Sequence, residues 1–277
     1  MIFEPASIAA LNAQYPDQPA PLRHQLGGRH LLTLSRLAEL AASLPPACVE
    51  YNAGDLPIDQ NPDLTPMNGL SLEDTIVRIT TCDSWMALKN IEQDPAYGAL
   101  LSDCLADIEP HIFAASGAMH RKEGFIFISS PNAVTPFHMD PEHNILMQVC
   151  GSKTMRIYPR AGIVSAEQHE AFHSKGGHRN LDYQKTFERQ AAAFKLQPGD
   201  AVYVPVKAPH WVQNGDAVSV SLSITWRSRL SDDEARLHRA NAWLRRYGAH
   251  PSPPETAPLR GQAKVLAHRL ASRITRR

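Results

Sequence analysis

The chain has 277 residues, of which 43% are hydrophobic and 20% are charged, and its formal net charge is zero. These values are ordinary for a globular protein, and no run of eighteen apolar residues is present that could span a bilayer. Residues 1–5 lack the features of a signal peptide, so a cytoplasmic location is expected. Residues 256–277 contain six Lys/Arg and no acid, which leaves 22 basic and 28 acidic residues elsewhere, a balance that disfavours nucleic acid as a partner.

The length allows one sizeable core, and the patterns divide the chain into three parts. We expect residues 1–123 to form a helical and loop region that packs on a barrel, residues 124–230 to form the barrel, and residues 231–277 to form C-terminal helices. The four cysteines include no Cys-x-x-Cys pair, so we expect reduced thiols rather than a zinc site or a disulfide framework.

The first part carries mainly helical signals. Its first 30 residues predict an irregular or partly helical segment. Helices are expected over residues 30–44 and 85–91, and two more are expected to begin at the serine cap Ser71 and at Asp94-Pro95. A short strand is expected over residues 48–51. Trp85 and Tyr97 are expected to be core residues rather than substrate contacts.

From Gly124 the hydrophobic period becomes that of a strand, with Phe125 and Phe127 on one face and Ile126 and Ile128 on the other. Short β-rich runs with turn signals between them follow, over residues 145–150, 154–158, 201–204 and 218–226. This arrangement predicts a mainly β fold with helical flanks, an antiparallel barrel or jelly roll. Residues 160–190, with His169, His173 and His178, are expected as an exposed insertion, and loop polarity explains these histidines without a metal site.

Two metal-binding residue types lie close together in the next extended segment. His138 and Asp140 are two residues apart, so their side chains leave the same face of a strand. A later histidine, His210, completes a set of two histidines and one carboxylate, the facial triad of a non-heme Fe(II) oxygenase. Such a triad leaves three coordination positions for substrate and O2. His143 has the opposite parity from Asp140 and is expected at the surface or facing a substrate.

These residues belong to three longer motifs. The motifs are Thr135-Pro-Phe-His138-Met-Asp140-Pro-Glu-His-Asn144, Gln148-Val-Cys-Gly151-Ser-Lys153, and Pro198-Gly-Asp-x-x-Tyr203-Val-Pro205 through His210-Trp211. Together they resemble the JmjC or cupin-like branch of the Fe(II)- and 2-oxoglutarate-dependent oxygenases, and their spacing is similar to that of the asparaginyl hydroxylases of that branch. The resemblance covers about residues 124–226 and implies a double-stranded β-helix core with an oxygenase active site.

The resemblance also implies roles for individual residues. His138, Asp140 and His210 would be the Fe(II) ligands. The residues that would bind or line the site of the cosubstrate 2-oxoglutarate are Thr135, Asn144, Lys153 and Phe127. On the last strand this chain reads Ser221-Leu-Ser223-Ile-Thr225-Trp226 where relatives often place an asparagine two residues before a tryptophan, so either Ser223 or Thr225 could face the iron.

The position of Lys153 supports the cosubstrate independently. Alternation from Asn144 to Cys150 puts Lys153 on the inward face of the next strand if the turn at Gly151-Ser152 keeps the register. A buried lysine is costly unless it meets a counter-charge, and a dicarboxylate supplies one. The alternative is a solvent-facing lysine at a hairpin tip.

Three functions are compatible with the sequence. The preferred one is a 2-oxoglutarate-dependent oxygenase that hydroxylates, or by hydroxylation demethylates, a peptide or protein side chain or a small molecule, with RNA less favoured. The others are a metal-dependent cupin enzyme that does not use 2-oxoglutarate and a non-catalytic binding module. The C-terminal helices resemble the place where relatives form homodimers.

Overall fold

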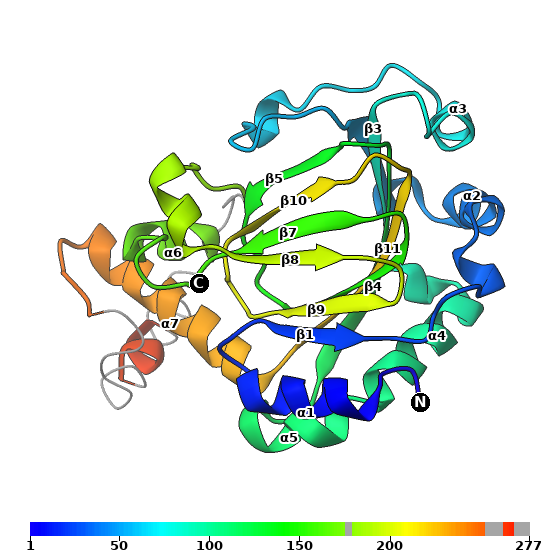
Figure 1. Ribbon diagram of the computed structural model, residues 1–277. Coiled ribbons are helices and arrows are strands. Elements are labelled where there is room, and N and C mark those ends of the chain that lie inside the picture. Colours follow the sequence, from blue (N-terminus) through cyan, green and yellow to red (C-terminus); the bar gives the residue numbers. More distant parts are fainter. Residues whose placement is uncertain (175–178, 253–262, 269–277) are drawn as a thin grey trace.

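The computed structural model describes residues 1–174, 179–252 and 263–268. Its centre is formed by two antiparallel sheets that face each other (Figure 1). In the described residues the larger sheet has seven strands in the order β1-β9-β6-β11-β4-β3-β2. Its strands are β1 (Ala20–Arg23), β2 (Val49–Ala53), β3 (Ser84–Lys89), β4 (His120–Ser129), β6 (His143–Cys150), β9 (Asp200–Val204) and β11 (Ser219–Arg227).

The smaller sheet lies in front of the larger one in Figure 1, and within the described ranges it has four strands in the order β5-β10-β7-β8. Its strands are β5 (Val134–His138), β7 (Lys153–Ile157), β8 (Ala192–Leu196) and β10 (His210–Asn214). The chain passes between the two sheets repeatedly, from β4 to β5 to β6 to β7, as in a jelly roll. The predicted double-stranded β-helix core is therefore confirmed.

Helices cover the outer face of the larger sheet and one end of the barrel (Figure 1). The α-helices are α1 (Pro5–Gln14), α2 (Leu34–Ser43), α3 (Leu72–Val77), α4 (Pro95–Ala106), α5 (Glu109–Ser116), α6 (Ala166–Phe172) and α7 (Arg229–Arg246). Short 3-10 helices are η1 (His30–Leu32), η2 (Pro46–Cys48), η3 (Pro62–Leu64), η4 (Ile91–Gln93) and η5 (Lys185–Gln190). The predicted caps are present on α3, where Ser71 accepts from the Asp74 amide, and on α4, where Asp94 accepts from the Ala96 amide.

Strand alternation separates two cores. Ile126 and Ile128 of β4 are fully buried in the larger core, between the outer face of the larger sheet and the helices. Leu146 and Met155 belong to a smaller core between the two sheets, against which Phe127 packs. Because one face of each strand supplies the helix interface, the other face is free to line the space inside the barrel.

The main error in the predicted elements concerns residues 85–91, where strand β3 extends to Lys89 and η4 begins at Ile91, in place of the expected helix. Ser84, Met86 and Leu88 are buried on one side, so the stretch alternates with a period of two. Three further strands, β1, β8 and β10, were not predicted. Strands β1, β2 and β3 all join the larger sheet, so residues 1–123 contribute strands as well as helices.

The expectation of an exposed loop over residues 160–190 is also wrong, because this insertion contains α6 and η5. His169 of α6 and His173, the residue after that helix, lie against His238 of α7, with ring centroids 5.2 Å from that of His238 in both cases. Burial lowers the pKa of His169 and His173 to about 3 and that of His238 to about 2, so the three imidazoles are neutral near pH 7. His178 lies outside the described residues.

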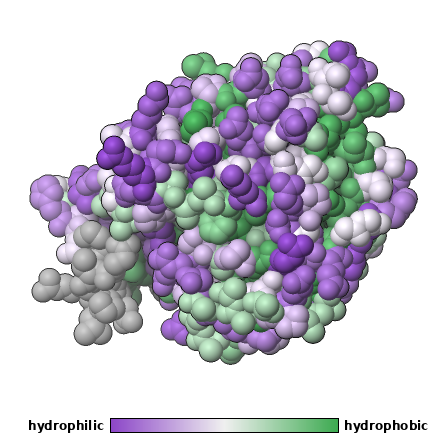
Figure 2. All heavy atoms as spheres, in the orientation of Figure 1, coloured by the Kyte–Doolittle hydropathy of each residue, from purple (hydrophilic) through white to green (hydrophobic). Residues whose placement is uncertain are grey.

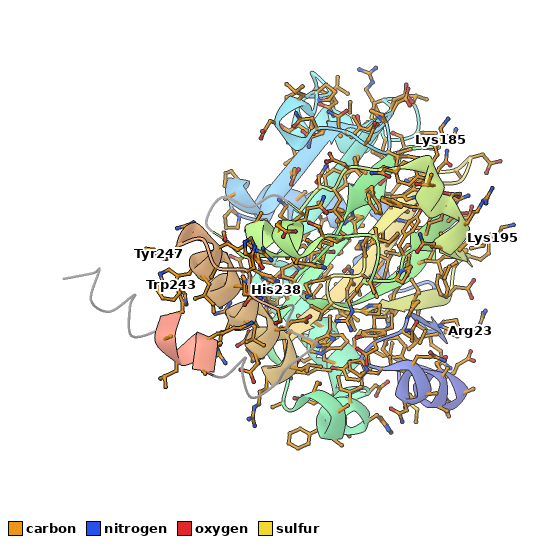
Figure 3. The ribbon with its side chains drawn as sticks, turned by 90° about the vertical axis from the view of Figure 1, so that its left-hand side faces the viewer. Arg23, Lys185, Lys195, His238, Trp243 and Tyr247 are labelled. Atoms are coloured by element: carbon orange, nitrogen blue, oxygen red, sulfur yellow. The ribbon has the colours of Figure 1, made fainter. Side chains whose placement is uncertain are left out.

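The C-terminal helix α7 begins at Arg229, two residues before residue 231, where the C-terminal helices were expected to start. The Ser228 hydroxyl accepts from the Ser231 amide and the Ser231 hydroxyl accepts from the Ser228 amide, so the true cap is reciprocal. His238 lies on the side of α7 that faces the protein, and Trp243 and Tyr247 lie toward its outer side (Figure 3). Farther along the expected C-terminal helices, residues 263–268 are helical, and residues 253–262 and 269–277 lie outside the described residues.

The face of the protein shown in Figure 2 is mainly hydrophilic, with small hydrophobic patches between the polar side chains. It includes the outer side of the smaller sheet, where Lys195 is exposed. In the part of the chain that the structure describes, no helix combines the length and the apolar character needed to cross a membrane.

Candidate metal centre and cosubstrate cavity

The two candidate histidine ligands come together because β5 and β10 are antiparallel neighbours. His138, the last residue of β5, is paired with His210, the first residue of β10, and their ring centroids are 4.1 Å apart. Asp140 follows two residues after His138, on the same face. Its Oδ2 lies 3.8 Å from Nε2 of His138 and 3.7 Å from Nε2 of His210. The structure thus brings all three predicted residues to one point.

The three side chains are arranged to offer lone pairs to a cation. Nδ1 of His138 lies 2.7 Å from the carbonyl oxygen of Pro136, and Nδ1 of His210 lies 2.8 Å from that of Ala208. A carbonyl can only accept, so each Nδ1 carries a proton, and in the neutral imidazole Nε2 is then the atom that offers a lone pair toward Asp140. Burial, followed by the neighbouring His138, lowers the pKa of His210 to about 4, which keeps its imidazole neutral.

The carboxylate of Asp140 is ionised in this environment. Burial by itself raises its pKa, but Arg179, His138 and His210 together lower it to about 2. Arg179 donates from Nη1 to Oδ1 of Asp140 at 2.7 Å. Across the described residues, no other group of three His, Cys, Asp or Glu side chains brings its ligand atoms so close together. Two imidazoles and one carboxylate are the ligand set of an Fe(II) site with open coordination positions.

A narrow cavity of about 50 Å³ extends from the three ligands into the barrel. Besides the ligands, it is lined by Trp85, Phe127, Thr135, Asn144, Leu146, Lys153, Met155 and Val212. The four residues expected to bind or line the site of the cosubstrate, Thr135, Asn144, Lys153 and Phe127, therefore lie together. They come from four different strands of both sheets.

Lys153 is the unusual member of this cavity. It is only 6% exposed, and burial lowers its pKa to about 7. Among the described residues its ammonium group has no hydrogen-bond or ion-pair partner. A buried cation is costly without a counter-charge, so the chemistry of the cavity calls for an anion near Lys153.

Neither of the last-strand residues lines the cavity, which differs from the expectation that one of them faces the iron. The Ser223 hydroxyl donates to Oδ1 of Asn144 at 2.7 Å, and the Thr225 hydroxyl donates to the carbonyl of Glu123 at 3.2 Å. Ser223 is thus one residue removed from the cavity, where it orients Asn144. Thr225 is turned toward β4.

A wider outer cavity of about 540 Å³ opens beside the metal centre. It shares Trp85, Phe127, Thr135, His138 and Asp140 with the inner one, so the two are adjacent. Trp85, which we expected in the core, forms part of its wall and stacks on Phe127 with a centroid distance of 5.9 Å. The short apolar run around it is compatible with helical and with strand spacing, so the sequence did not decide between the two.

The sequence reasoning also misjudged two other residues near the site. Arg179, which contacts Asp140, lies in the insertion, where nothing in the sequence distinguishes it from other cations. His143 is buried instead of exposed. Its Nδ1 is hydrogen-bonded to the Tyr203 hydroxyl and its Nε2 to the Ser228 hydroxyl, both at 2.9 Å, and its ring stacks on Trp226. These contacts make it part of the support behind the larger sheet.

Comparison with known proteins agrees with this fold and assigns the chain to a family. The sequence profile of the cupin-like domain family matches residues 78–232, more than half of the chain and all three candidate ligands. The chain belongs to the cupin-like domain family. The predicted JmjC or cupin-like relationship is therefore confirmed.

Two curated relatives are similar over about a third of the chain. The lysine-specific demethylase JMJ30 of Arabidopsis thaliana is 34% identical over 105 residues, which are 34% of this chain and 23% of the relative. Jumonji C domain-containing protein 5 of Drosophila melanogaster is 32% identical over 107 residues, which are 36% of this chain and 26% of the relative. The similarity thus spans about a quarter of the length of these relatives.

Solved structures of the Escherichia coli protein YcfD have a similar fold. One aligns with 98% of this chain and 69% of its own with a TM-score of 0.54 and 14% identity. Another, described as a ribosomal oxygenase in complex with cobalt and 2-oxoglutarate, aligns with 90% of this chain and 59% of its own, with a TM-score of 0.50 and 14% identity. At this identity the likeness concerns the fold.

The metal centre predicts the effect of removing its carboxylate. Asp140→Ala should weaken Co²⁺ binding by more than about 100-fold, beyond the effect usual for an outer partner of a ligand, while the circular dichroism spectrum stays that of the folded protein. Asp103→Ala, which removes an exposed carboxylate on α4, is the control. Titration followed by the visible bands of bound Co²⁺ measures both. Unchanged affinity in Asp140→Ala would exclude this site.

Proposed function

We propose that the protein is an Fe(II)- and 2-oxoglutarate-dependent dioxygenase that hydroxylates a C–H bond of its substrate. The observation that carries the proposal is Lys153, which is buried without a partner among the described residues, in a cavity whose wall includes the three candidate metal ligands. A dicarboxylate that chelates the metal with its keto acid end and reaches Lys153 with its other carboxylate would satisfy both groups. One curated relative is named a lysine-specific demethylase, an enzyme name that is compatible with this proposal.

In this proposal each cavity residue has a role in holding the cosubstrate. Lys153 pairs with the distal carboxylate, and the Thr135 hydroxyl donates a second hydrogen bond to it. Because Oδ1 of Asn144 accepts from Ser223, the amide nitrogen of Asn144 remains as a donor toward the cosubstrate. Phe127 contributes an apolar wall, which excludes water and strengthens the charge interaction at Lys153.

When bound, the iron supplies the redox chemistry by which O2 decarboxylates 2-oxoglutarate to succinate and hydroxylates the substrate. The protein itself would hold the metal and the cosubstrate and exclude water from them. His138, Asp140 and His210 bind the metal from one side and leave the other side open. Their hydrogen bonds to Pro136, Ala208 and Arg179 keep the ligand atoms aimed at that position.

The outer cavity is the proposed place for the substrate, because it opens directly onto His138 and Asp140. Trp85, Phe125 and Phe127 give it an aromatic wall, and the ion pair of Lys89 with Glu50 lies at its edge. A side chain of a peptide or protein, or a small molecule, would fit such a groove. Homodimer formation through the C-terminal helices and a cytoplasmic location remain part of the proposal.

The proposal predicts turnover of the cosubstrate without a substrate. With Fe(II), 2-oxoglutarate and O2, the wild-type protein should form succinate slowly, because the cavity admits the cosubstrate before any substrate is present. Asp140→Ala should form none, and Asp103→Ala should match the wild type. Succinate can be measured by mass spectrometry. If the metal-loaded wild type forms no succinate at saturating 2-oxoglutarate, the alternatives, a cupin enzyme without 2-oxoglutarate or a binding module, gain instead.

Lys153 gives a second prediction, with a pH dependence. Lys153→Ala should weaken 2-oxoglutarate binding by about 10- to 100-fold, since a charged hydrogen bond contributes about 1.5–3 kcal/mol, and should leave Co²⁺ affinity unchanged. Lys195→Ala, which removes an exposed lysine on β8, is the control. Isothermal titration under anaerobic conditions measures both affinities.

The sign of the pH effect follows from the lowered pKa. Burial lowers the pKa of Lys153 to about 7, so the cosubstrate-free protein loses this ammonium charge as the pH rises above 7. Binding the carboxylate then requires uptake of a proton, and the dissociation constant of 2-oxoglutarate should rise by up to about tenfold per pH unit. Lys153→Ala should lack this rise. An equal pH dependence in both proteins would contradict the pairing.

A further inference from the structure

The two carboxylate oxygens of Asp140 have different partners. Oδ2 faces the Nε2 atoms of His138 and His210, at 3.8 and 3.7 Å. Oδ1 points away from them and accepts from Nη1 of Arg179 at 2.7 Å. The carboxylate is therefore divided between the candidate metal position and a guanidinium group on the insertion.

The backbone of the insertion fixes where Arg179 lies. Met139 donates to the carbonyl of Arg179 at 3.1 Å, and Leu181 donates to the carbonyl of Phe137 at 2.9 Å. Asn180 forms an antiparallel bridge with His138 between these two bonds. The insertion thus pairs with the segment that carries two of the ligands, and this pairing brings Arg179 over Asp140.

A second acid orients the guanidinium from the other side. Nη2 of Arg179 lies 3.9 Å from Glu142, which in turn accepts from Arg227 at 2.8 Å. Asp140, Arg179, Glu142 and Arg227 therefore form a row of alternating charges. The side chain of Arg179 is 53% exposed, so its pairing with Asp140 is not required to fill the core.

A carboxylate can bind a metal through one oxygen or through both. Three protein ligand atoms on an octahedral metal leave three positions, of which a keto acid takes two and O2 needs one. If Asp140 bound through both oxygens, it would occupy one of these positions. A guanidinium that engages Oδ1 prevents this, although its positive charge close to the metal does not itself favour metal binding.

We propose that Arg179 is a positioning residue that restricts Asp140 to one metal-binding oxygen and so keeps a coordination position open. The inference rests on the proposed oxygenase function, because only that chemistry needs three open positions. It also gives the insertion a defined task, since the segment that covers the site supplies the group that sets its coordination. Metal affinity does not test this role. Removing Arg179 frees a second carboxylate oxygen and removes a nearby positive charge, and both changes favour metal binding.

The test counts water molecules on the metal. In protein loaded with Mn²⁺, H₂¹⁷O broadens the electron paramagnetic resonance lines in proportion to the bound waters. The wild type should hold three, and Arg179→Ala should hold two, with Mn²⁺ bound at least as tightly. Succinate formation should fall by about 10- to 100-fold, the range usual for an outer partner of a metal ligand.

Two variants separate this role from a general loss of charge or structure. Arg179→Lys keeps a cationic donor for Oδ1 and should restore three waters. Glu142→Gln removes the charge of the other partner of Arg179, leaves the bond to Asp140 and should also keep three. Three waters in Arg179→Ala, or two in Glu142→Gln, would overturn the proposal. The water count does not depend on 2-oxoglutarate, so it remains informative even if the protein fails to turn over 2-oxoglutarate.

Discussion

Antiparallel pairing between β5 and β10 places His138 opposite His210, and the metal centre depends on this register. Alternation along β5 and the residues after it then determines which side chains face the candidate metal position. Phe137 and Met139 are buried in a cluster with Tyr158 and Trp211, so the residues between and after them, His138 and Asp140, face the opposite way. A slip of one residue would exchange the apolar anchors for the ligands. The packing of the anchors therefore holds the ligands in place.

A second constraint is the burial of Lys153 inside the same barrel. A pKa lowered from 10.5 to about 7 corresponds to a cost on the order of 5 kcal/mol for keeping this lysine charged, which exceeds the contribution of an ordinary hydrogen bond. A stable fold gains nothing from such a residue, because an apolar side chain would pack there at lower cost. A bound ligand that carries a negative charge would compensate the buried charge of Lys153. The candidate metal ligands and this lysine thus line one cavity.

Much of this arrangement could be predicted from the sequence because it depends on local parity. His138 and Asp140 share a face by their spacing, and Phe127 and Lys153 point inward by alternation along their strands. Arg179 could not be predicted, since its position follows from backbone pairing between the insertion and the end of β5. The parity of His143 was predicted correctly as opposite to that of Asp140. Its burial was not predicted, because that side of the chain faces the hydroxyl groups of Tyr203 and Ser228 rather than solvent. Trp85 was misassigned because an apolar run of this length satisfies both helical and strand spacing.

The central claim is that one cavity holds the metal and 2-oxoglutarate together, and an optical titration tests it most directly. Addition of 2-oxoglutarate to the Fe(II) protein without O2 should produce a visible charge-transfer band, because chelation by the keto acid requires an iron with two adjacent open positions. The band should saturate at one equivalent per iron, and in Lys153→Ala it should require a higher concentration of 2-oxoglutarate. Iron bound at full occupancy with no band at any concentration of 2-oxoglutarate would contradict the account.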